Sequence, residues 1–143
     1  MIPKSLESFL RERLPDGMRA SRLTREHGGC FMEFTAADAD RLARLGIQPD
    51  PLGPLLVVCL WDEASPHEVG GYLVVDNLAM GSPSMGGIRM LPDLTPAAIH
   101  NLARGMTLKN AAANLPHGGG KCGLLVDEDL APPALRSCAP SRA

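Results

Sequence analysis

The sequence predicts a single α/β domain, in which a mixed β-sheet is flanked by helices in three layers. Its 143 residues are the size of one ordinary domain and are enough to bury a core. Three compact runs of aliphatic and β-branched residues, each bounded by turn residues, are typical of buried strands. A long helical pattern separates the second run from the third. Strands followed by a helix and another strand are typical of the α/β class.

The N-terminal third predicts two short helices. Residues 1–14 carry apolar side chains at helical spacing, and the pattern stops at Pro15. An apolar patch at 30–34 is followed by Thr35, which is a good N-cap for a helix running through 38–45. Gly46 then ends that helix, because glycine adopts the backbone conformation of a C-cap without strain.

The strands and the main helix come next along the chain. The three strand runs are 55–61, 72–75 and 123–126. Thr95 and the proline after it form an N-cap and a first helical position, and they predict a helix over 96–113. The tail at 131–143 is rich in Ala, Pro, Ser and Arg, and we expect it to be disordered.

Composition and charge exclude several classes of protein. Hydrophobic residues make up 45% of the chain and charged residues 21%, which rules out wholesale disorder. Fourteen basic and 16 acidic residues give a net charge of −2, so we expect no nucleic-acid partner. The longest apolar run is far shorter than the roughly 20 residues of a membrane span, which predicts no membrane partner and a cytoplasmic location. The cysteines are too widely spaced for a zinc site and are interpreted as reduced thiols: Cys30, Cys59, Cys122 and Cys138.

The segment from Pro116 to Gly123 is the most informative candidate site. A predicted triple-glycine turn brings Lys121 directly into an apolar strand. Glycines let a ligand approach the backbone, and a lysine at the root of a buried strand can act in acid/base chemistry. The alternative is an ordinary glycine turn with a solvated lysine. A phosphate-binding P-loop is disfavoured, because Cys122 stands where that motif needs Ser or Thr and a strand replaces its helix.

A second lysine, Lys109, lies near the end of the predicted helix, three residues after Met106. Alone, it would be interpreted as a partner of the helix dipole. Together with Lys121 it indicates a cleft for an anionic ligand such as a carboxylate. The loop at 81–87 ends in two glycines, and Met85 beside them would give that cleft an apolar lining.

Four blocks of sequence carry a family resemblance: residues 71–77, 85–90, 102–113 and 118–121. In order and spacing they resemble the N-terminal, dimerisation and substrate-binding domain of the glutamate/leucine/phenylalanine/valine dehydrogenases. The resemblance covers about 55–126, and we assign residues 1–130 to that domain. The segment Leu-Ala-Arg-Gly-Met-Thr at 102–107 is most similar to the leucine/phenylalanine/valine branch of that family.

The resemblance implies a role for each site residue. Lys121 would be the catalytic lysine, which assists the attack of water on the imine and stabilises the charged intermediate. Lys109 would hold the α-carboxylate of the substrate, and Met106, Gly86 and Gly87 would line the site. Met85 stands where glutamate-specific members usually carry a lysine, so a substrate with an apolar side chain is expected.

The resemblance also implies cofactor and partners. Family members use NAD(P) to deaminate an L-amino acid reversibly to a 2-oxo acid and ammonium, and they form homo-oligomers. We expect an apolar strand such as 55–61 to supply an exposed edge for that association. The catalytic aspartate and the Rossmann domain of the family are not among these residues, so the chain alone is expected to bind no cofactor and to be inactive.

Three alternatives stay open at this stage. The chain is either a truncated dehydrogenase or a free-standing domain that has lost catalysis. In the second case it would be a relic module that binds a carboxylate or drives oligomerisation. An unrelated small α/β binding protein is the third possibility.

Overall fold

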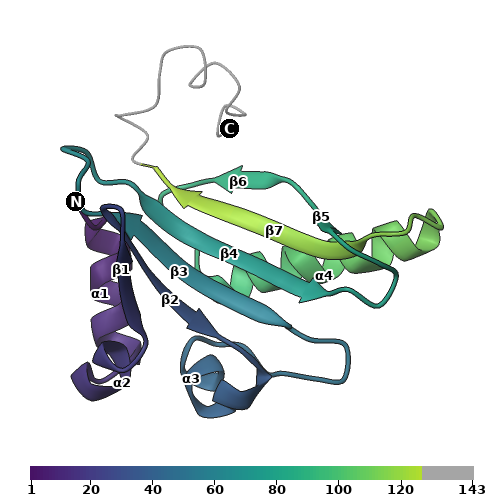
Figure 1. Cartoon of the computed structure of the whole chain (residues 1–143), viewed down its shortest axis with the longest axis horizontal. Coiled ribbons are helices and arrows are strands. Elements are labelled where there is room, and N and C mark those ends of the chain that lie inside the picture. The colour runs from purple at the N-terminus through teal and green to yellow at the C-terminus, as the bar shows by residue number, and fades with distance from the viewer. Residues whose placement is uncertain (127–143) are drawn as a thin grey trace, which may run out of the picture.

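A seven-stranded mixed sheet forms the centre of the molecule in a computed structural model that describes residues 1–126 (Figure 1). The strands lie in the order β1 (Leu23–Glu26), β2 (Gly29–Phe34), β3 (Leu56–Asp62), β4 (Gly70–Asn77), β7 (Gly118–Leu125) and β5 (Ser84–Met85), and β6 (Ile88–Met90) also pairs with β7. Pairing is antiparallel from β1 to β7, whereas β5 and β6 run parallel to β7. The predicted mixed sheet is confirmed. The predicted tail at 131–143 lies outside the described residues.

The first helix is confirmed as α1 (Lys4–Arg13), which is followed by the short α2 (Asp16–Ala20). The hairpin of β1 (Leu23–Glu26) and β2 (Gly29–Phe34) was not predicted. Three of the four β1 residues are exposed, so the strand carries no apolar alternation that the sequence could reveal. His27 and Gly28 both have positive φ, which is the geometry of a tight hairpin turn.

The second predicted helix is present as a 3₁₀ turn, η1 (Ala36–Asp38), continued by α3 (Ala39–Arg44). Thr35 is the N-cap, and Asp38 completes a capping box with it. Gly46 has a φ of 83° at the end of the helix, as its C-cap role predicts.

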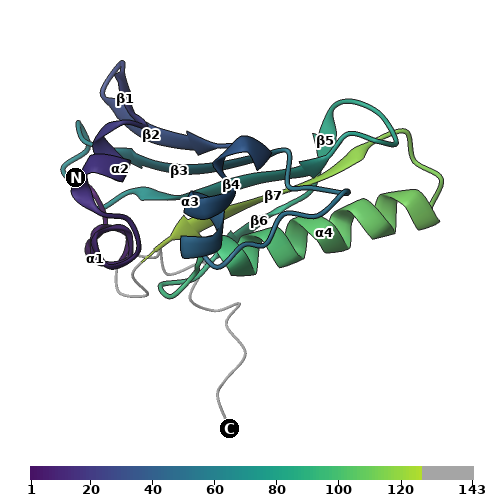
Figure 2. The same cartoon turned by 90° about the horizontal axis from the view of Figure 1, so that it is seen from below.

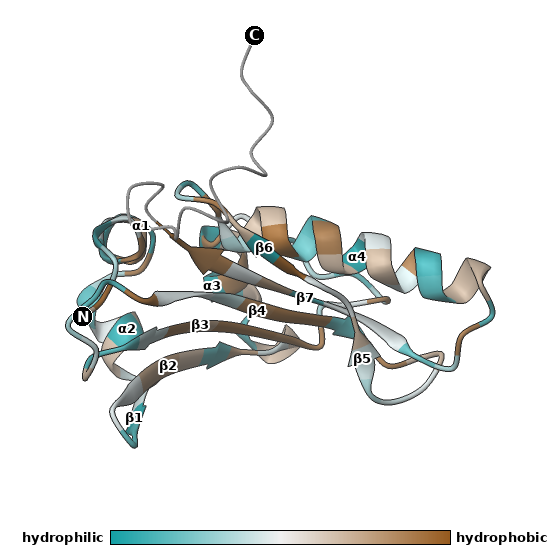
Figure 3. Cartoon of the chain, turned by 90° about the horizontal axis from the view of Figure 1, so that it is seen from above, coloured by the Kyte–Doolittle hydropathy of each residue, from teal (hydrophilic) through white to brown (hydrophobic). Residues whose placement is uncertain are grey.

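The central strands are β3 (Leu56–Asp62) and β4 (Gly70–Asn77). Side chains of one face of these strands are buried against the helices, including Val57, Tyr72 and Val74. Figure 3 shows this hydrophobic band running along β3 and β4. The predicted strands at 55–61 and 72–75 are therefore confirmed, with β4 longer than predicted at both ends.

The main helix is α4 (Pro96–Ala112), and it matches the predicted 96–113 closely. Thr95 caps it by accepting a hydrogen bond from the Ala98 N–H at 3.2 Å. The last strand, β7, spans Gly118–Leu125. The predicted glycine turn is thus wrong, because Gly118 to Gly120 already belong to the strand. A Cβ on Gly118 would overlap the backbone of β4, one on Gly119 would overlap Thr107 of α4, and one on Gly120 would overlap Ser84 of β5, so the glycines let the strand lie close to all three elements.

All longer helices lie on one side of the sheet. Figure 2 shows α1, α3 and α4 on the same face, with α2 beside α1. No helix of residues 1–126 covers the opposite face, where Leu73 is 38% exposed. The predicted three-layer arrangement is therefore corrected to two layers in the described part of the chain. Burial in the middle of β4 is the physical reason, because Tyr72 and Val74 on the helix face are buried whereas Leu73 is exposed and Val75 half-buried on the other face.

Candidate functional site

The candidate site is built where α4 crosses β7. The helix buries Ile99, Ala103 and Thr107 against the sheet. A Cβ added to Gly123 would meet Ile99, and one added to Gly119 would overlap Thr107. The absence of side chains at these two glycines lets the backbone of β7 lie unusually close to the helix.

Lys121 lies between these two glycines on the strand. It pairs with Val74, a core residue of β4, so its side chain starts on the face that carries the helices. A Cβ built on Gly87 would lie 3.2 Å from the Lys121 Nζ. The structure therefore brings Lys121 and Gly87 together, as the sequence predicts, and a larger residue at position 87 would crowd the ammonium group.

The glycine pair at 86–87 precedes β6 (Ile88–Met90) and packs on β7. A Cβ on Gly86 would overlap the carbonyl oxygen of Gly120. The Cys122 N–H donates to the Gly87 carbonyl at 3.1 Å. Met85 lies just before the pair in β5 (Ser84–Met85), opposite Gly119, and is 41% exposed. The loop predicted at 81–87 therefore contains a short strand.

Lys109 lies in the last turn of α4 and is exposed, whereas Met106, one turn earlier, is half-buried. The next residue, Asn110, is buried and donates from its side-chain amide to the Gly118 carbonyl at 2.9 Å. This bond fixes the end of the helix to the start of β7. Within residues 1–126, neither Lys109 nor Lys121 forms an ion pair with a carboxylate. Both ammonium groups are therefore available to an anionic ligand.

A buried polar cluster beside this site was not predicted. Asp76, at the end of β4, is fully buried. It accepts hydrogen bonds from Thr107 Oγ1 at 2.6 Å and Arg104 Nε at 2.7 Å. His100 Nε2 lies 3.2 Å from the other carboxylate oxygen. This contact holds the His100 side chain, which is 12% exposed, against the sheet.

Arg104 extends the cluster to the connection before β3. Its two terminal nitrogens lie 2.8 and 2.9 Å from the Asp50 carboxylate. The Arg104 guanidinium lowers the pKa of Asp50 to about 2, and the two carboxylates raise the pKa of Arg104 above its ordinary value. The guanidinium therefore stays charged and ties three distant segments together.

A β-bulge makes this cluster possible. The register between β4 and β7 shifts between Val75 and Asn77, so two consecutive side chains, Asp76 and Asn77, are both buried. The Asn77 side-chain oxygen also accepts a hydrogen bond from the Ala79 N–H at 3.1 Å, which stabilises the turn after the strand. The polar stripe of His100, Arg104 and Thr107 on one helix face was the signal in the sequence that could have revealed the cluster.

The glycines of β7 share the spacing of a dinucleotide-binding motif but not its structure. Gly118, Gly120 and Gly123 match the spacing G-x-G-x-x-G, but all three lie inside β7. A dinucleotide fingerprint needs that spacing in a turn between a strand and a helix, so these residues do not fit the cofactor. No cluster of metal-binding side chains occurs in residues 1–126. Cys30, Cys59 and Cys122 are free, and burial raises the pKa of Cys59 to about 12.

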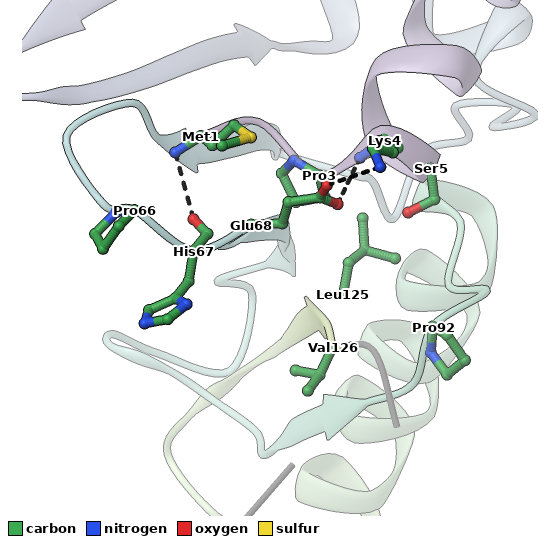
Figure 4. A pocket seen from close by; sticks show the side chains of 10 residues that line it. All are labelled: Met1, Pro3, Lys4, Ser5, Pro66, His67, Glu68, Pro92, Leu125 and Val126. Atoms are coloured by element: carbon green, nitrogen blue, oxygen red, sulfur yellow. Dashed lines mark hydrogen bonds and ion pairs between the residues drawn. The ribbon is translucent and has the colours of Figure 1, made fainter. Parts of the chain in front are cut away.

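A separate pocket of about 520 Å³ lies between the N-terminus and the end of β7 (Figure 4). Lys4, Glu68 and Leu125 are among the residues that line it. Neither Lys109 nor Lys121 contributes to this pocket, so it is distinct from the candidate site.

No helix in residues 1–126 has the length and apolarity to cross a membrane.

Comparison with known proteins identifies the family. Residues 58–134 match the family model described as Glu/Leu/Phe/Val dehydrogenase, dimerisation domain. A glutamate dehydrogenase of Thermotoga maritima is 53% identical over 57 residues, which are 40% of this chain and 14% of that protein. An NADP(+)-dependent glutamate dehydrogenase of Pyrobaculum calidifontis is 35% identical over 131 residues, covering 78% of this chain and 31% of that protein.

Two solved structures are similar to this chain at lower sequence identity than the relatives above. An L-tryptophan dehydrogenase from Nostoc punctiforme has a TM-score of 0.43 and 31% identity, over 54% of this chain and 24% of that one. A hetero-hexameric glutamate dehydrogenase from Thermus thermophilus has a TM-score of 0.47 and 24% identity, over 92% of this chain and 28% of that one.

The matched relatives are much longer than this chain, which spans less than a third of their length. Both of these relatives are glutamate dehydrogenases, so the prediction that the chain is closest to the leucine/phenylalanine/valine type gains no support from them and stays a prediction. The match over 58–134 covers more than half of the chain and includes Lys109 and Lys121. The chain belongs to the Glu/Leu/Phe/Val dehydrogenase family, whose dimerisation domain it contains.

Proposed function

We propose that this chain forms the substrate-binding part of an L-amino-acid dehydrogenase site, which deaminates an amino acid reversibly to a 2-oxo acid and ammonium. The observation that supports the proposal is the packing of α4 on β7, with Lys121 beside Gly87 on the strand and Lys109 at the end of the helix, neither of them paired with a carboxylate in the described residues. Family membership supports the same assignment.

Each lysine has a distinct role in this proposal. The Lys109 ammonium pairs with the α-carboxylate of the substrate, which orients the carbon that bears the nitrogen. Lys121 acts at that carbon. Water adds to the imine carbon and gives up a proton with the help of the Lys121 amine, the carbon–nitrogen bond then breaks, and ammonium leaves. Met106, Gly86 and Gly87 line the space between the two lysines.

The identity of the substrate side chain depends on Met85. A thioether cannot pair with a second carboxylate, so the proposed substrate carries an apolar side chain. Met85 lies in β5 opposite Gly119, two positions from Lys121 on the neighbouring strand. This position supports the proposal that Met85 contacts the side chain of the substrate.

Binding of a 2-oxo acid tests the proposal on the chain as it is. We expect the 2-oxo acid of leucine to bind, and Lys109→Ala or Lys121→Ala to weaken binding by about 10- to 100-fold, the value of one charge-assisted hydrogen bond. Isothermal titration calorimetry measures the dissociation constants. Lys4→Ala is the matched control, because it removes an equal charge from an exposed lysine that lines the other pocket. Equal losses in all three variants would refute a specific site.

A substitution at Met85 tests the choice of side chain. Met85→Lys should shift the preference from the 2-oxo acid of leucine towards 2-oxoglutarate, by about tenfold or more in the ratio of dissociation constants. The same titration with both ligands gives that ratio. An unchanged ratio would show that Met85 does not face the substrate side chain.

The cofactor of the family supplies hydride transfer, and we propose that the protein's NAD(P) is not held by residues 1–126. Those residues lack a glycine-rich turn between a strand and a helix, as shown above. We therefore expect the 143-residue chain alone to produce no NADH from leucine, valine or phenylalanine. Steady production that Lys121→Ala abolishes would contradict this expectation.

Self-association is a second proposed function, favoured by the uncovered face of the sheet. Leu73 on that face is 38% exposed, and Ile88 at the β6 edge is 66% exposed. The edge predicted at 55–61 is wrong, since β3 lies between β2 and β4. A second copy of the chain would instead cover the open face or the β6 edge. Light scattering at micromolar concentration should show more than a monomer, and Leu73→Lys should weaken the association.

A further inference from the structure

We infer that Asp76 is a positioning residue, which holds α4 against the sheet and so sets the place of Lys109 relative to Lys121. This inference rests on the proposed function of the two lysines. It is carried by hydrogen bonds from α4, the helix of Lys109, to the Asp76 carboxylate on β4, the strand that pairs with the β7 strand of Lys121.

Asp76 contacts α4 through three successive turns of the helix. His100, Arg104 and Thr107 lie on one helix face, and the side chain of each reaches the Asp76 carboxylate. A fourth donor, the Asn77 side-chain amide, lies 3.3 Å away. These bonds are directional, so they fix the rotation of the helix about its axis as well as its distance from the sheet.

Asp76 is connected to Lys121 through the pairing of β4 with β7. Val74 pairs with Lys121, and Asp76 follows two residues later on the same face of the strand. The bulge at this point turns Asp76 and Asn77 together towards the helix. Any shift of α4 along β4 would therefore also change its register with the lysine-bearing strand.

On α4, the residues on either side of Lys109 are held by hydrogen bonds to the sheet. Thr107, two residues before it, donates to Asp76. Asn110, one residue after it, donates to the Gly118 carbonyl at the start of β7. Lys109 itself is exposed and has no ion-pair partner in the described residues, so its position is set by these two neighbours.

A third segment, the turn that contains Asp50 and Gly53, packs against the polar cluster around Asp76. The Arg104 guanidinium bridges Asp76 and Asp50, and the turn that contains Asp50 packs Gly53 directly on the backbone of Asp76. Gly53 has a φ of 155° and could not carry a Cβ there without overlap. A fully buried carboxylate is costly unless every partner is in place, which favours one arrangement of the three segments over sliding alternatives.

The test compares two buried carboxylates in the 143-residue chain. Asp76→Asn keeps the shape and removes the charge. Asp38→Asn is the matched control, because Asp38 is 4% exposed and is also held by two arginines, Arg22 and Arg41, away from α4. We expect Asp76→Asn to weaken binding of the 2-oxo acid of leucine by at least about tenfold, and Asp38→Asn to change it by less than about twofold.

A second readout needs no ligand. In the free chain, Asp76→Asn should move the backbone amide signals of Lys109, Asn110 and Gly118 to Gly120 in a ¹H–¹⁵N spectrum, while Asp38→Asn leaves them in place. Wild-type signals and affinity in Asp76→Asn would overturn the inference, as would equal changes in Asp38→Asn. Should Asp76→Asn fail to fold, Arg104→Lys decides by the same criteria, since it keeps the charge and loses the bridge to Asp50. Absence of binding in the wild type refutes the proposed function, and the amide signals then still decide the positioning role.

Discussion

Two buried carboxylates, Asp38 and Asp76, hold different parts of this molecule in different ways. Asp38 accepts hydrogen bonds from the Thr35 N–H and from the guanidinium groups of Arg22 and Arg41. Its partners lie no more than 16 residues away in sequence. Asp76 instead binds His100, Arg104 and Thr107, which are 24 to 31 residues away.

The difference separates a local role from a long-range one. Burial tends to raise the pKa of Asp38, but the Thr35 N–H and the two arginines outweigh it and hold that pKa below its ordinary value. This carboxylate caps a helix start that the sequence already favours. Asp76 holds together elements that have no local reason to meet, and the candidate site lies where they meet.

The largest expected effect comes from the contact that Asp76 holds in place. Gly119→Val should lower the free energy of unfolding by about 3 kcal/mol or more, because the new side chain would overlap Thr107 on α4. Gly105→Ala is the matched control. It lies in the same helix with open space around it and should raise stability by about 0.5–1 kcal/mol. Urea denaturation of both variants measures the difference, and a mild loss for Gly119→Val would show that α4 is not packed tightly on β7.

The second-largest expected effect is a difference in stability between variants that lack Asp76 and variants that lack Asp38. Asp76→Ala removes the hydrogen-bond partner of three groups, His100 Nε2, Arg104 Nε and Thr107 Oγ1, while Arg104 keeps its bonds to Asp50, and should cost about 3–5 kcal/mol. Asp38→Ala should cost about 1–2 kcal/mol, because it removes a cap and Arg22 is 42% exposed and can turn to water. The same denaturation series compares them. Equal losses would remove the distinction between a local and a long-range role.

The smallest expected effect is a change in how the free energy of unfolding depends on pH in acid solution. The pKa of Asp50 is held at about 2, below its unfolded value of about 3.9. Its contribution to stability is therefore complete above about pH 4 and is lost as the pH falls towards 2. Asp50→Asn should flatten the fall of the unfolding free energy across that window. Asp93→Asn, at an exposed position without a side-chain partner in the described residues, should leave the profile unchanged.

The sequence predicted the parts of this fold that are encoded locally. Thr95 before Pro96 fixed the start of α4, and Gly46 fixed the end of α3, because caps act through neighbouring backbone groups. The family resemblance assigns Lys109 and Lys121 to the site, because each lysine lies in a short continuous motif, and that assignment stays a prediction.

Features that depend on pairing between distant segments were missed. The exposed strand β1 forms only because β2 offers it a partner, and no apolar pattern announces it. The glycines at 118–120 were interpreted as a turn, since only the presence of α4 beside them explains a strand without side chains. The buried role of Asp76 could not be predicted either, because its partners come from a helix 24 or more residues away.

A crystal structure of the chain with the 2-oxo acid of leucine bound is the most direct test of the central claim that α4 and β7 bring two lysines to one ligand. It should show the α-carboxylate at the Lys109 Nζ and the carbonyl carbon facing the Lys121 Nζ, with Gly86 and Gly87 beneath the ligand. The same crystal should show Arg104 between Asp76 and Asp50. Ammonium groups that point to opposite faces of the sheet, or a ligand that contacts neither lysine, would contradict the claim.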